Sequence, residues 1–209
     1  EFLQQVMLLP EDITAPALKP LEYASHFSVF YPRFDKEMYT KLLDELEVPT
    51  DQTMSSMSLG QKKKALIAFS LACNTDILLL DEPTNGLDII SKSKFRKLIA
   101  AQMQENRIII ISTHQVKDLE QLIDRILVLN NGNIIFNESI PEIGKQLLFT
   151  IVNGNAETEG LIYEENSLRG NAVVMKNNSG ADSKVDLELL YKALQYHPDK
   201  LNSIFNSNN

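Results

Sequence analysis

Two adjacent carboxylates, Asp81 and Glu82, follow the aliphatic run Ile77–Leu80. Such runs fit strands that are buried on both faces of a parallel sheet, and ligands of open parallel sheets bind at the carboxyl ends of the strands. Because successive strand residues point to opposite sides, one carboxylate can reach a Mg²⁺ shell while the other faces an attacking water. Mg²⁺ on phosphates needs only one or two protein carboxylates. The alternative is a strand that ends in a polar turn.

A third carboxylate and a histidine follow in a similar setting. The turn Pro83–Asp88 ends in a carboxylate, and a second aliphatic run, Ile108–Ile111, is followed by Ser112-Thr113-His114. A histidine at the end of a neighbouring parallel strand can face the same site, so His114 is a candidate site residue. His26 and His197 have no such context and are interpreted as structural or exposed.

The segment Met57–Lys64 brings serine and glycine to the start of an expected helix. Free backbone N–H groups and the helix dipole favour an anion there, and Gly60 permits close approach of a phosphate to the backbone. Ser58 and Gly60 are therefore candidate phosphate contacts. The alternative is a capped helix with a solvated lysine run.

Three segments, in their order along the chain, resemble those of the ATP-binding-cassette (ABC) ATPase family. They are Met57–Lys64, Ile77–Asp88 and Ile108–His114. Met57–Gln61 is similar to the family's signature motif, usually Leu-Ser-Gly-Gly-Gln, although Leu59 replaces the first glycine. Ile77–Asp81 resembles the Walker B strand, and Glu82 resembles the catalytic glutamate that follows it.

Further motifs extend the resemblance over roughly residues 6–139. Asn85–Asp88 resembles the D-loop, and His114 resembles the switch histidine. Leu9-Pro10-Glu11 resembles the Q-loop, with Glu11 where glutamine is more usual. Asn131-Gly132 in the last hairpin is also typical of the family.

The resemblance implies a role for each residue on the chain's own side of an ATP site. Asp81 would help to hold Mg²⁺ through water, and Glu11 would be a second metal contact, since glutamate also ligates Mg²⁺. Glu82 would polarise the attacking water, and His114 would contact the γ-phosphate. Catalysis would then consist of positioning and electrostatic stabilisation.

The resemblance also implies contacts with a second subunit. Ser58 and Gly60, grouped with Gln61 as nucleotide-binding residues, would contact the γ-phosphate bound by the opposite subunit of a head-to-tail dimer. Asp88 would line the dimer interface. The other implied partner is an integral membrane transporter subunit, so that Mg-ATP hydrolysis drives transport and the protein is cytoplasmic, peripheral to the inner face of the membrane.

The phosphate cradle Gly-x-x-x-x-Gly-Lys-Ser/Thr has no counterpart in the sequence. The single Gly-Lys pair, Gly144-Lys145, is followed by Gln146, and Ser139 stands where the first glycine is required. In the family this cradle precedes the Q-loop. We therefore expect a cassette without its N-terminal Walker A portion, whose full-length parent is an ATPase and which is inactive on its own.

The elements predict an α/β fold, a partial P-loop NTPase (RecA-like) parallel sheet with a helical subdomain and a small C-terminal α+β extension. We expect a partial ABC ATPase domain over 1–140, with the helical subdomain at about 18–75, and an accessory region over 141–209. Strands are expected at Val6–Leu9, Ile77–Leu80, Ile108–Ile111, Ile126–Leu129 (a third buried run), Ile134–Phe136, Leu147–Val152, Leu161–Tyr163 and Ala172–Met175.

Helical spacing predicts the remaining elements. The segment Pro20–Glu47 is broken at Pro32, after which Asp35 can cap the next helix. Asn130–Asn133 is a hairpin signal, and the Asn/Ser tail is expected to fray. Other helices are expected at Gln61–Cys73, Ile89–Glu105, Val116–Ile123 and Asp186–Tyr196.

Composition narrows the classes of function. The net charge of −8 argues against whole-surface attraction to nucleic acid or anionic lipid, and the single cysteine, Cys73, excludes a disulfide framework. No apolar run approaches the ~20 residues of a membrane span. Alternatives to a transporter subunit are an ABC ATPase acting on ribosomes or DNA, disfavoured by the acidic charge, and a catalytically inactive binding module.

Aromatic residues of the helical subdomain are candidates for docking on the membrane partner. Core packing is the alternative for at least half of them. They are Tyr23, Phe30, Tyr31 and Phe34.

Overall fold

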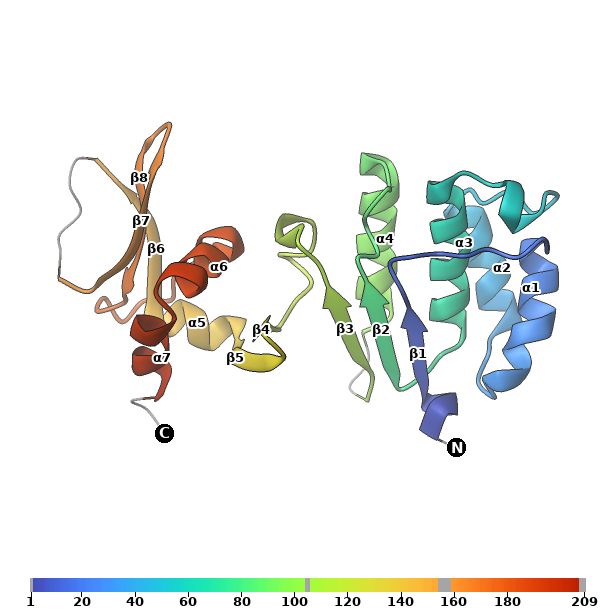
Figure 1. The fold of residues 1–209 in the computed structure, drawn as a ribbon, viewed down its shortest axis with the longest axis horizontal. Helices are drawn as coiled ribbons and strands as arrows, with labels where there is room; N and C mark the ends of the chain where they lie inside the picture. Colours follow the sequence, from blue (N-terminus) through green and yellow to red (C-terminus); the bar gives the residue numbers. More distant parts are fainter. Residues whose placement is uncertain (1, 104–105, 154–158, 207–209) are drawn as a thin grey trace. The chain divides into compact units, whose positions relative to one another are not determined.

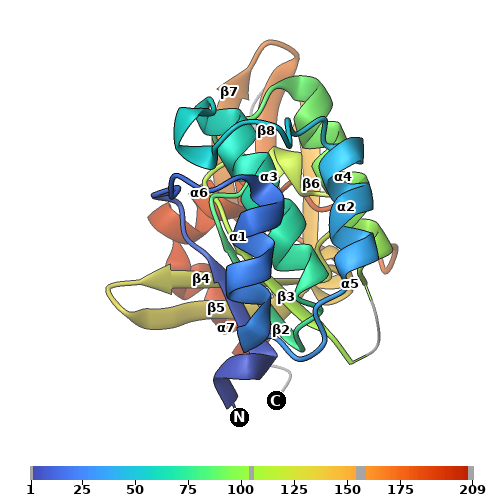
Figure 2. The ribbon, with the colours of Figure 1, turned by 90° about the vertical axis from the view of Figure 1, so that its right-hand side faces the viewer.

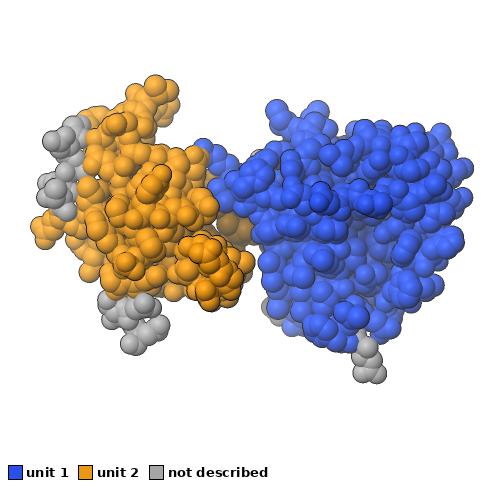
Figure 3. Space-filling model, viewed as in Figure 1, with its two compact units in different colours: residues 1–118 blue, residues 119–209 orange. Residues whose placement is uncertain are grey.

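The computed structural model describes residues 2–103, 106–153 and 159–206, and the chain forms two compact units, residues 1–118 and 119–209 (Figure 3). Each unit has its own sheet and helices. We describe the two units separately.

A three-stranded parallel sheet organises the first unit (Figure 1). Strand β2 (Ile77–Asp81) lies between β1 (Val6–Leu9) and β3 (Ile108–Ser112). The register places Leu80 opposite both Leu9 and Ile111, and Asp81 opposite Ser112. All three strands therefore end at one edge of the sheet, which confirms the α/β fold with a parallel sheet.

The two faces of this sheet differ in burial. On one face, Leu9, Leu78 and Leu80 are at most 2% exposed. On the other, Leu8 is 55% and Ile110 is 49% exposed, and both lie in one row with Leu79 of β2. The core of the unit thus lies on the first face.

Four helices accompany the sheet: α1 (Pro20–Phe27), α2 (Lys36–Glu45), α3 (Leu59–Ala72) and α4 (Ile89–Ala101). Helix α2 packs against α3, and α3 contacts β1; Figure 2 shows α1, α2 and α3 grouped together. The predicted break near Pro32 is confirmed, since residues 28–35 separate α1 from α2. Asp35 caps α2, with its Oδ1 accepting from the Met38 amide at 2.8 Å. Short 3₁₀ turns lie at Phe2–Gln5, Ser28–Phe30 and Met54–Ser56.

Phe69 on α3 is the centre of an aromatic cluster in the helical region. Its ring lies 5.0–6.1 Å from those of Tyr23, Tyr31, Phe34 and Tyr39. Three of the four aromatic docking candidates therefore take part in core packing. The fourth, Phe30, is 61% exposed.

Two sequence predictions at the junction of the units are wrong. The segment 116–123 contains only a 3₁₀ turn, Val116–Asp118, in place of a helix. The run 126–129 is no buried strand of the parallel sheet: β4 (Arg125–Asn130) pairs antiparallel with β5 (Asn133–Ser139) in a sheet of two strands. The aliphatic run alternates instead, with Val128 buried while Leu127 and Leu129 are exposed. The hairpin between the two strands is as predicted.

The second unit also holds a three-stranded antiparallel sheet in the order β6-β8-β7. Leu187–Tyr196 matches the predicted helix, and a further helix runs from Pro198 to Asn206. The end of the Asn/Ser tail, residues 207–209, lies outside the described residues, so its expected fraying stays a prediction. The elements are α5 (Ile140–Gln146), β6 (Leu147–Val152), β7 (Leu161–Ser167), β8 (Gly170–Lys176), α6 (Leu187–Tyr196) and α7 (Pro198–Asn206).

The compact units divide earlier in the chain than the domain boundary predicted near residue 140. The reason is that the β4–β5 hairpin packs with later elements. Phe136 of β5 lies 5.2 Å, ring to ring, from Phe205 of α7, and the Ile140 amide bonds to the Asp124 carbonyl. The assignment of 1–140 as one functional domain stays a prediction.

Candidate functional site

The carboxyl ends of β2 and β3 bring together three residues that the sequence predicted for the site: Asp81, Glu82 and His114. Asp81 ends β2 opposite Ser112, whose hydroxyl donates to Asp81 Oδ1. Glu82 follows with a φ of +43°, a conformation that is unusual for a residue with a side chain. Its amide still bonds to the Ser112 carbonyl at 3.0 Å. The left-handed step thus turns the chain away from the sheet directly after Asp81.

The Glu82 carboxylate is held by the end of β3. Its Oε1 accepts from the His114 amide at 2.8 Å and lies 2.6 Å from His114 Nδ1, while Oε2 accepts from the Thr113 hydroxyl at 3.2 Å. An ionised carboxylate only accepts hydrogen bonds, so His114 Nδ1 carries the proton. The Glu82 side chain is 13% exposed and that of His114 67%. The histidine therefore orients the glutamate while its own ring stays open to solvent.

The N-terminus of α3 carries the signature-like residues in a capping box. The Ser58 hydroxyl accepts from the Gln61 amide at 3.3 Å, and Gln61 Oε1 accepts from the Ser58 amide at 3.0 Å. A hydroxyl has one donor and two acceptor positions. The cap therefore uses Ser58 as an acceptor and leaves its O–H as a donor for an anion.

Gly60 brings this helix end against the turn that follows Glu82. A Cβ on Gly60 would lie 3.2 Å from the Gly86 carbonyl oxygen, and one on Gly86 would lie 3.5 Å from the Leu59 side chain. Gly86 itself has a φ of +78°. The α3 N-terminus and the D-loop-like turn are thus in direct contact within one chain.

Asp88 caps α4. Its two carboxylate oxygens accept from the Ser91 amide and the Ser91 hydroxyl, both at 2.8 Å. These hydrogen bonds lower the pKa of Asp88. Asp88 therefore has a structural role at the start of α4, and its interface role stays a prediction.

Glu11 lies beyond the end of β1 and accepts from Asn85 Nδ2 at 3.0 Å. Within the described residues, no group of three or more His, Cys, Asp and Glu side chains could by itself hold a metal ion. Mg²⁺ on phosphates takes only one or two carboxylates from the protein. Asp81 has two carboxylate oxygens, one bonded to Ser112, so this donor set fits a metal whose remaining ligands are phosphate and water.

Lys63 is a residue of the site that sequence reasoning missed. A solvated lysine run is one of the two alternatives for this segment, but Lys63 is only 2% exposed and its Nζ donates to the Glu82 carbonyl oxygen at 2.7 Å. Burial lowers the pKa of Lys63, and the charges of Glu11, Glu82 and Asp81 act in the opposite direction. Spacing along the helix gave no signal for it, because Lys62 and Lys64 also stand four residues before buried residues, Leu66 and Ala68.

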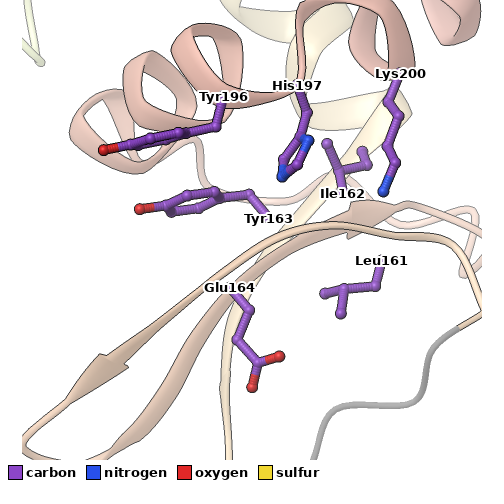
Figure 4. Close-up of a pocket in the computed structure, with 7 residues that line it drawn as sticks. All are labelled: Leu161, Ile162, Tyr163, Glu164, Tyr196, His197 and Lys200. Atoms are coloured by element: carbon purple, nitrogen blue, oxygen red, sulfur yellow. The ribbon is translucent and has the colours of Figure 1, made fainter.

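A separate pocket of about 460 Å³ lies in the second unit (Figure 4). Tyr163 and Tyr196 stack there with ring centroids 5.8 Å apart, and His197 lies 6.5 Å from Tyr163. No residue predicted from the motifs lines it. The lining residues are Leu161, Ile162, Tyr163, Glu164, Tyr196, His197 and Lys200.

Comparison with solved structures places the fold. The ATP-binding subunit of an ABC transporter superposes with a TM-score of 0.61 at 22% identity, covering 67% of this chain and 61% of that one. A dimeric ATP-binding cassette in a post-hydrolysis state, bound to ADP and Pi, gives 0.56 at 21% identity, covering 65% and 62%. The fold is that of ABC ATPase domains, a P-loop NTPase fold.

The relatives found by sequence are also named as ATP-binding proteins of transporters. An uncharacterized ABC transporter ATP-binding protein of Methanocaldococcus jannaschii is 32% identical over 114 residues, 54% of this chain and 44% of that protein. The ABC transporter ATP-binding protein YtrB of Bacillus subtilis is 26% identical (65% and 47%), and the bacitracin transport ATP-binding protein BcrA of Bacillus licheniformis 38% (46% and 31%). The resemblance to ABC transporter ATP-binding proteins is thereby confirmed.

Three further findings belong beside this resemblance. The chain spans less than half the length of these curated relatives. Residues 25–117 match a family model described as "AAA domain, putative AbiEii toxin, Type IV TA system". Among the residues that the structure describes, no helix has the length and apolar character needed to cross a membrane.

Proposed function

We propose that this chain contributes to the nucleotide-binding subunit of an ABC transporter that hydrolyses ATP with Mg²⁺. The observation that supports it most is the meeting of Asp81, Glu82 and His114 at the ends of adjacent parallel strands. Ser58 and Gly60, at the α3 N-terminus, add an anion-binding element. The relatives' names supply the same activity class.

In the proposed reaction, each residue acts from the position described above. Glu82, oriented by His114 and Thr113, polarises the attacking water, and the exposed His114 ring contacts the γ-phosphate. Asp81 and Glu11 hold the metal, which when bound neutralises charge on the phosphates. Catalysis of this kind consists of positioning and electrostatic stabilisation.

A second subunit is part of the proposal. Ser58, Gly60 and Gln61 would face the γ-phosphate held by the opposite subunit in a head-to-tail dimer, and Asp88 would line that interface. A dimeric cassette among the similar structures supports this arrangement. A membrane-embedded transporter subunit, which the relatives' names imply, would place the protein at the cytoplasmic face of the membrane.

Glu82→Gln in the protein at its full natural length tests the proposal. The amide keeps the shape but cannot serve as a base, so we expect hydrolysis to slow by about 10²- to 10⁴-fold with nucleotide binding retained. ATP turnover and equilibrium nucleotide binding are the measurements. Glu45→Gln, an exposed glutamate on α2, is the matched control and keeps wild-type turnover. Wild-type turnover in Glu82→Gln would refute the proposed role.

Copurification tests the membrane partner independently. We expect the full-length protein to be recovered with an integral membrane protein. Recovery with ribosomes or DNA in its place would favour an ABC ATPase that does not transport.

A further inference from the structure

The ammonium of Lys63 joins two parts of the proposed site that the motifs treat as separate. Lys63 lies in the first turns of α3, five residues after Ser58, and its Nζ is 2.7 Å from the carbonyl oxygen of Glu82. The side chain is 2% exposed, whereas Lys62 and Lys64 on either side are not buried. A buried ammonium is costly unless it is paired and hydrogen-bonded.

The acceptor is the backbone of the proposed catalytic residue. The Glu82 carbonyl accepts from Lys63 Nζ and also from the Asn85 amide at 3.1 Å. A carbonyl oxygen has two lone pairs, so both bonds can form together. Glu82 is also held in the left-handed region, at a φ of +43°, a conformation that persists only when its surroundings enforce it.

A second contact joins the same two segments, the start of α3 and the turn 82–86. Gly60 lies close enough to the Gly86 carbonyl that a Cβ would be 3.2 Å from it. The start of α3 therefore meets the turn 82–86 at both ends of that turn: Lys63 hydrogen-bonds to Glu82, and Gly60 lies close to Gly86. The carboxylates of Glu11, Glu82 and Asp81 also act electrostatically on the Lys63 ammonium.

We propose that Lys63 is a positioning residue: its ammonium fixes the left-handed backbone at Glu82 and ties the glutamate to the α3 N-terminus that carries Ser58 and Gly60. The inference rests on the proposed function.

Lys63→Met tests the inference, because methionine keeps an unbranched stem and removes the donor. In the full-length protein we expect kcat for ATP to fall by about tenfold to 10²-fold, as for a small misplacement of a reacting group, with KM unchanged. Lys63→Arg, which restores a charged donor, should recover part of kcat. Lys62→Met is the matched control and keeps wild-type kcat. An unchanged kcat in Lys63→Met would overturn the inference.

Hydrogen exchange supplies a readout that needs no nucleotide. In Lys63→Met the Asn85 amide, which bonds to the same carbonyl, should exchange several-fold faster, while the amides of β3 other than Ser112 keep their protection. Equal Asn85 protection in both proteins would contradict the inference even if kcat changed. If Glu82→Gln abolishes hydrolysis but Lys63→Met alters neither quantity, the inference fails and the proposed function stands.

The wild-type protein offers a test that does not depend on the variant's folding. Reductive methylation of surface amines, read by mass spectrometry, should modify Lys62 and Lys64 much faster than Lys63. Equal rates at Lys62 and Lys63 would show that the buried bond to Glu82 is not formed, and would overturn the inference.

Discussion

Glu82 serves the site through both its backbone and its side chain. The carboxylate is held by Thr113 and His114, which follow β3, and the carbonyl is held by Lys63 from α3. Two different elements thus restrict one residue. This arrangement reduces the freedom of the carboxylate before any substrate arrives, which is how positioning contributes to a rate.

His114→Ala is the residue-scale test of the switch assignment. The change removes the Nδ1 contact that orients Glu82 and the ring proposed to contact phosphate. We expect turnover to fall by about 10²-fold, as when one preorganised donor is lost. Steady-state ATP hydrolysis of the full-length protein measures it.

His26→Ala is the control for that variant, because His26 Nδ1 hydrogen-bonds within its own helix, to the Glu22 carbonyl and the Ser25 hydroxyl. It should keep wild-type turnover. If His114→Ala matches His26→Ala, the histidine has no part in the reaction.

Among single residues of the site, the sequence predicted those that follow strands and missed Lys63, which lies along a helix. Asp81 and His114 follow uninterrupted aliphatic runs, so their position at the sheet edge follows from the pattern. Lys63 has a lysine on each side, and a charge run predicts a solvated face. Its burial depends on the closeness of α3 to the Glu82 turn, which no local pattern reports.

For helices and strands, too, the sequence predicted local features such as caps and did not predict which strands pair. The caps at Asp35 and Ser58 were predictable because a short polar side chain precedes a helical pattern. The error at 126–129 arose because an aliphatic run does not say which strand it pairs with. The β4–β5 pairing is set by the turn at Asn131-Gly132, where both residues have positive φ.

Tyr39 connects two helices of the first unit. Its hydroxyl donates to the Pro20 carbonyl at 3.0 Å, and its side chain is fully buried. At pH 7 we expect Tyr39→Phe to lower the free energy of unfolding by about 1 kcal/mol through loss of this bond. Urea unfolding of both proteins measures it.

The same substitution has a pH dependence with a defined sign. Burial raises the pKa of Tyr39 above its ordinary value of 10.0. The folded state therefore binds the Tyr39 proton more tightly than the unfolded state does. The resulting contribution to the free energy of unfolding is fully present below pH 10 and is lost as the pH rises above 10. Since one pH unit corresponds to about 1.4 kcal/mol, the two unfolding curves should converge near pH ~11. A difference that is constant from pH 7 to 11 would contradict the assignment.

At the scale of the whole molecule, the 209 residues carry the residues proposed to face the metal and the attacking water, without a phosphate-cradle sequence. We expect this chain alone to bind ATP no more tightly than a millimolar Kd, because the cradle supplies most contacts with the phosphates. Isothermal titration calorimetry with Mg-ATP measures it. Micromolar binding would show that the described residues suffice.

The two compact units could be anticipated only in outline. The change of character after residue 140 is visible in the sequence as short strands and turns. The hairpin before it packs with that later part through Phe136 and Phe205, a contact between residues far apart in the chain. Such a contact depends on tertiary structure, so the sequence placed the division later than the structure does.

Two features of the chain act in opposite directions on the association of copies: the open face of the parallel sheet and the net charge. Leu8, Ile108 and Ile110 present aliphatic surface to water, and surface of this kind favours association between copies. The net charge of −8 keeps copies apart. Because the Debye length falls from about 10 Å at 0.1 M salt to about 3 Å at 1 M, ionic strength sets which property prevails, and low-salt buffers favour the dispersed chain.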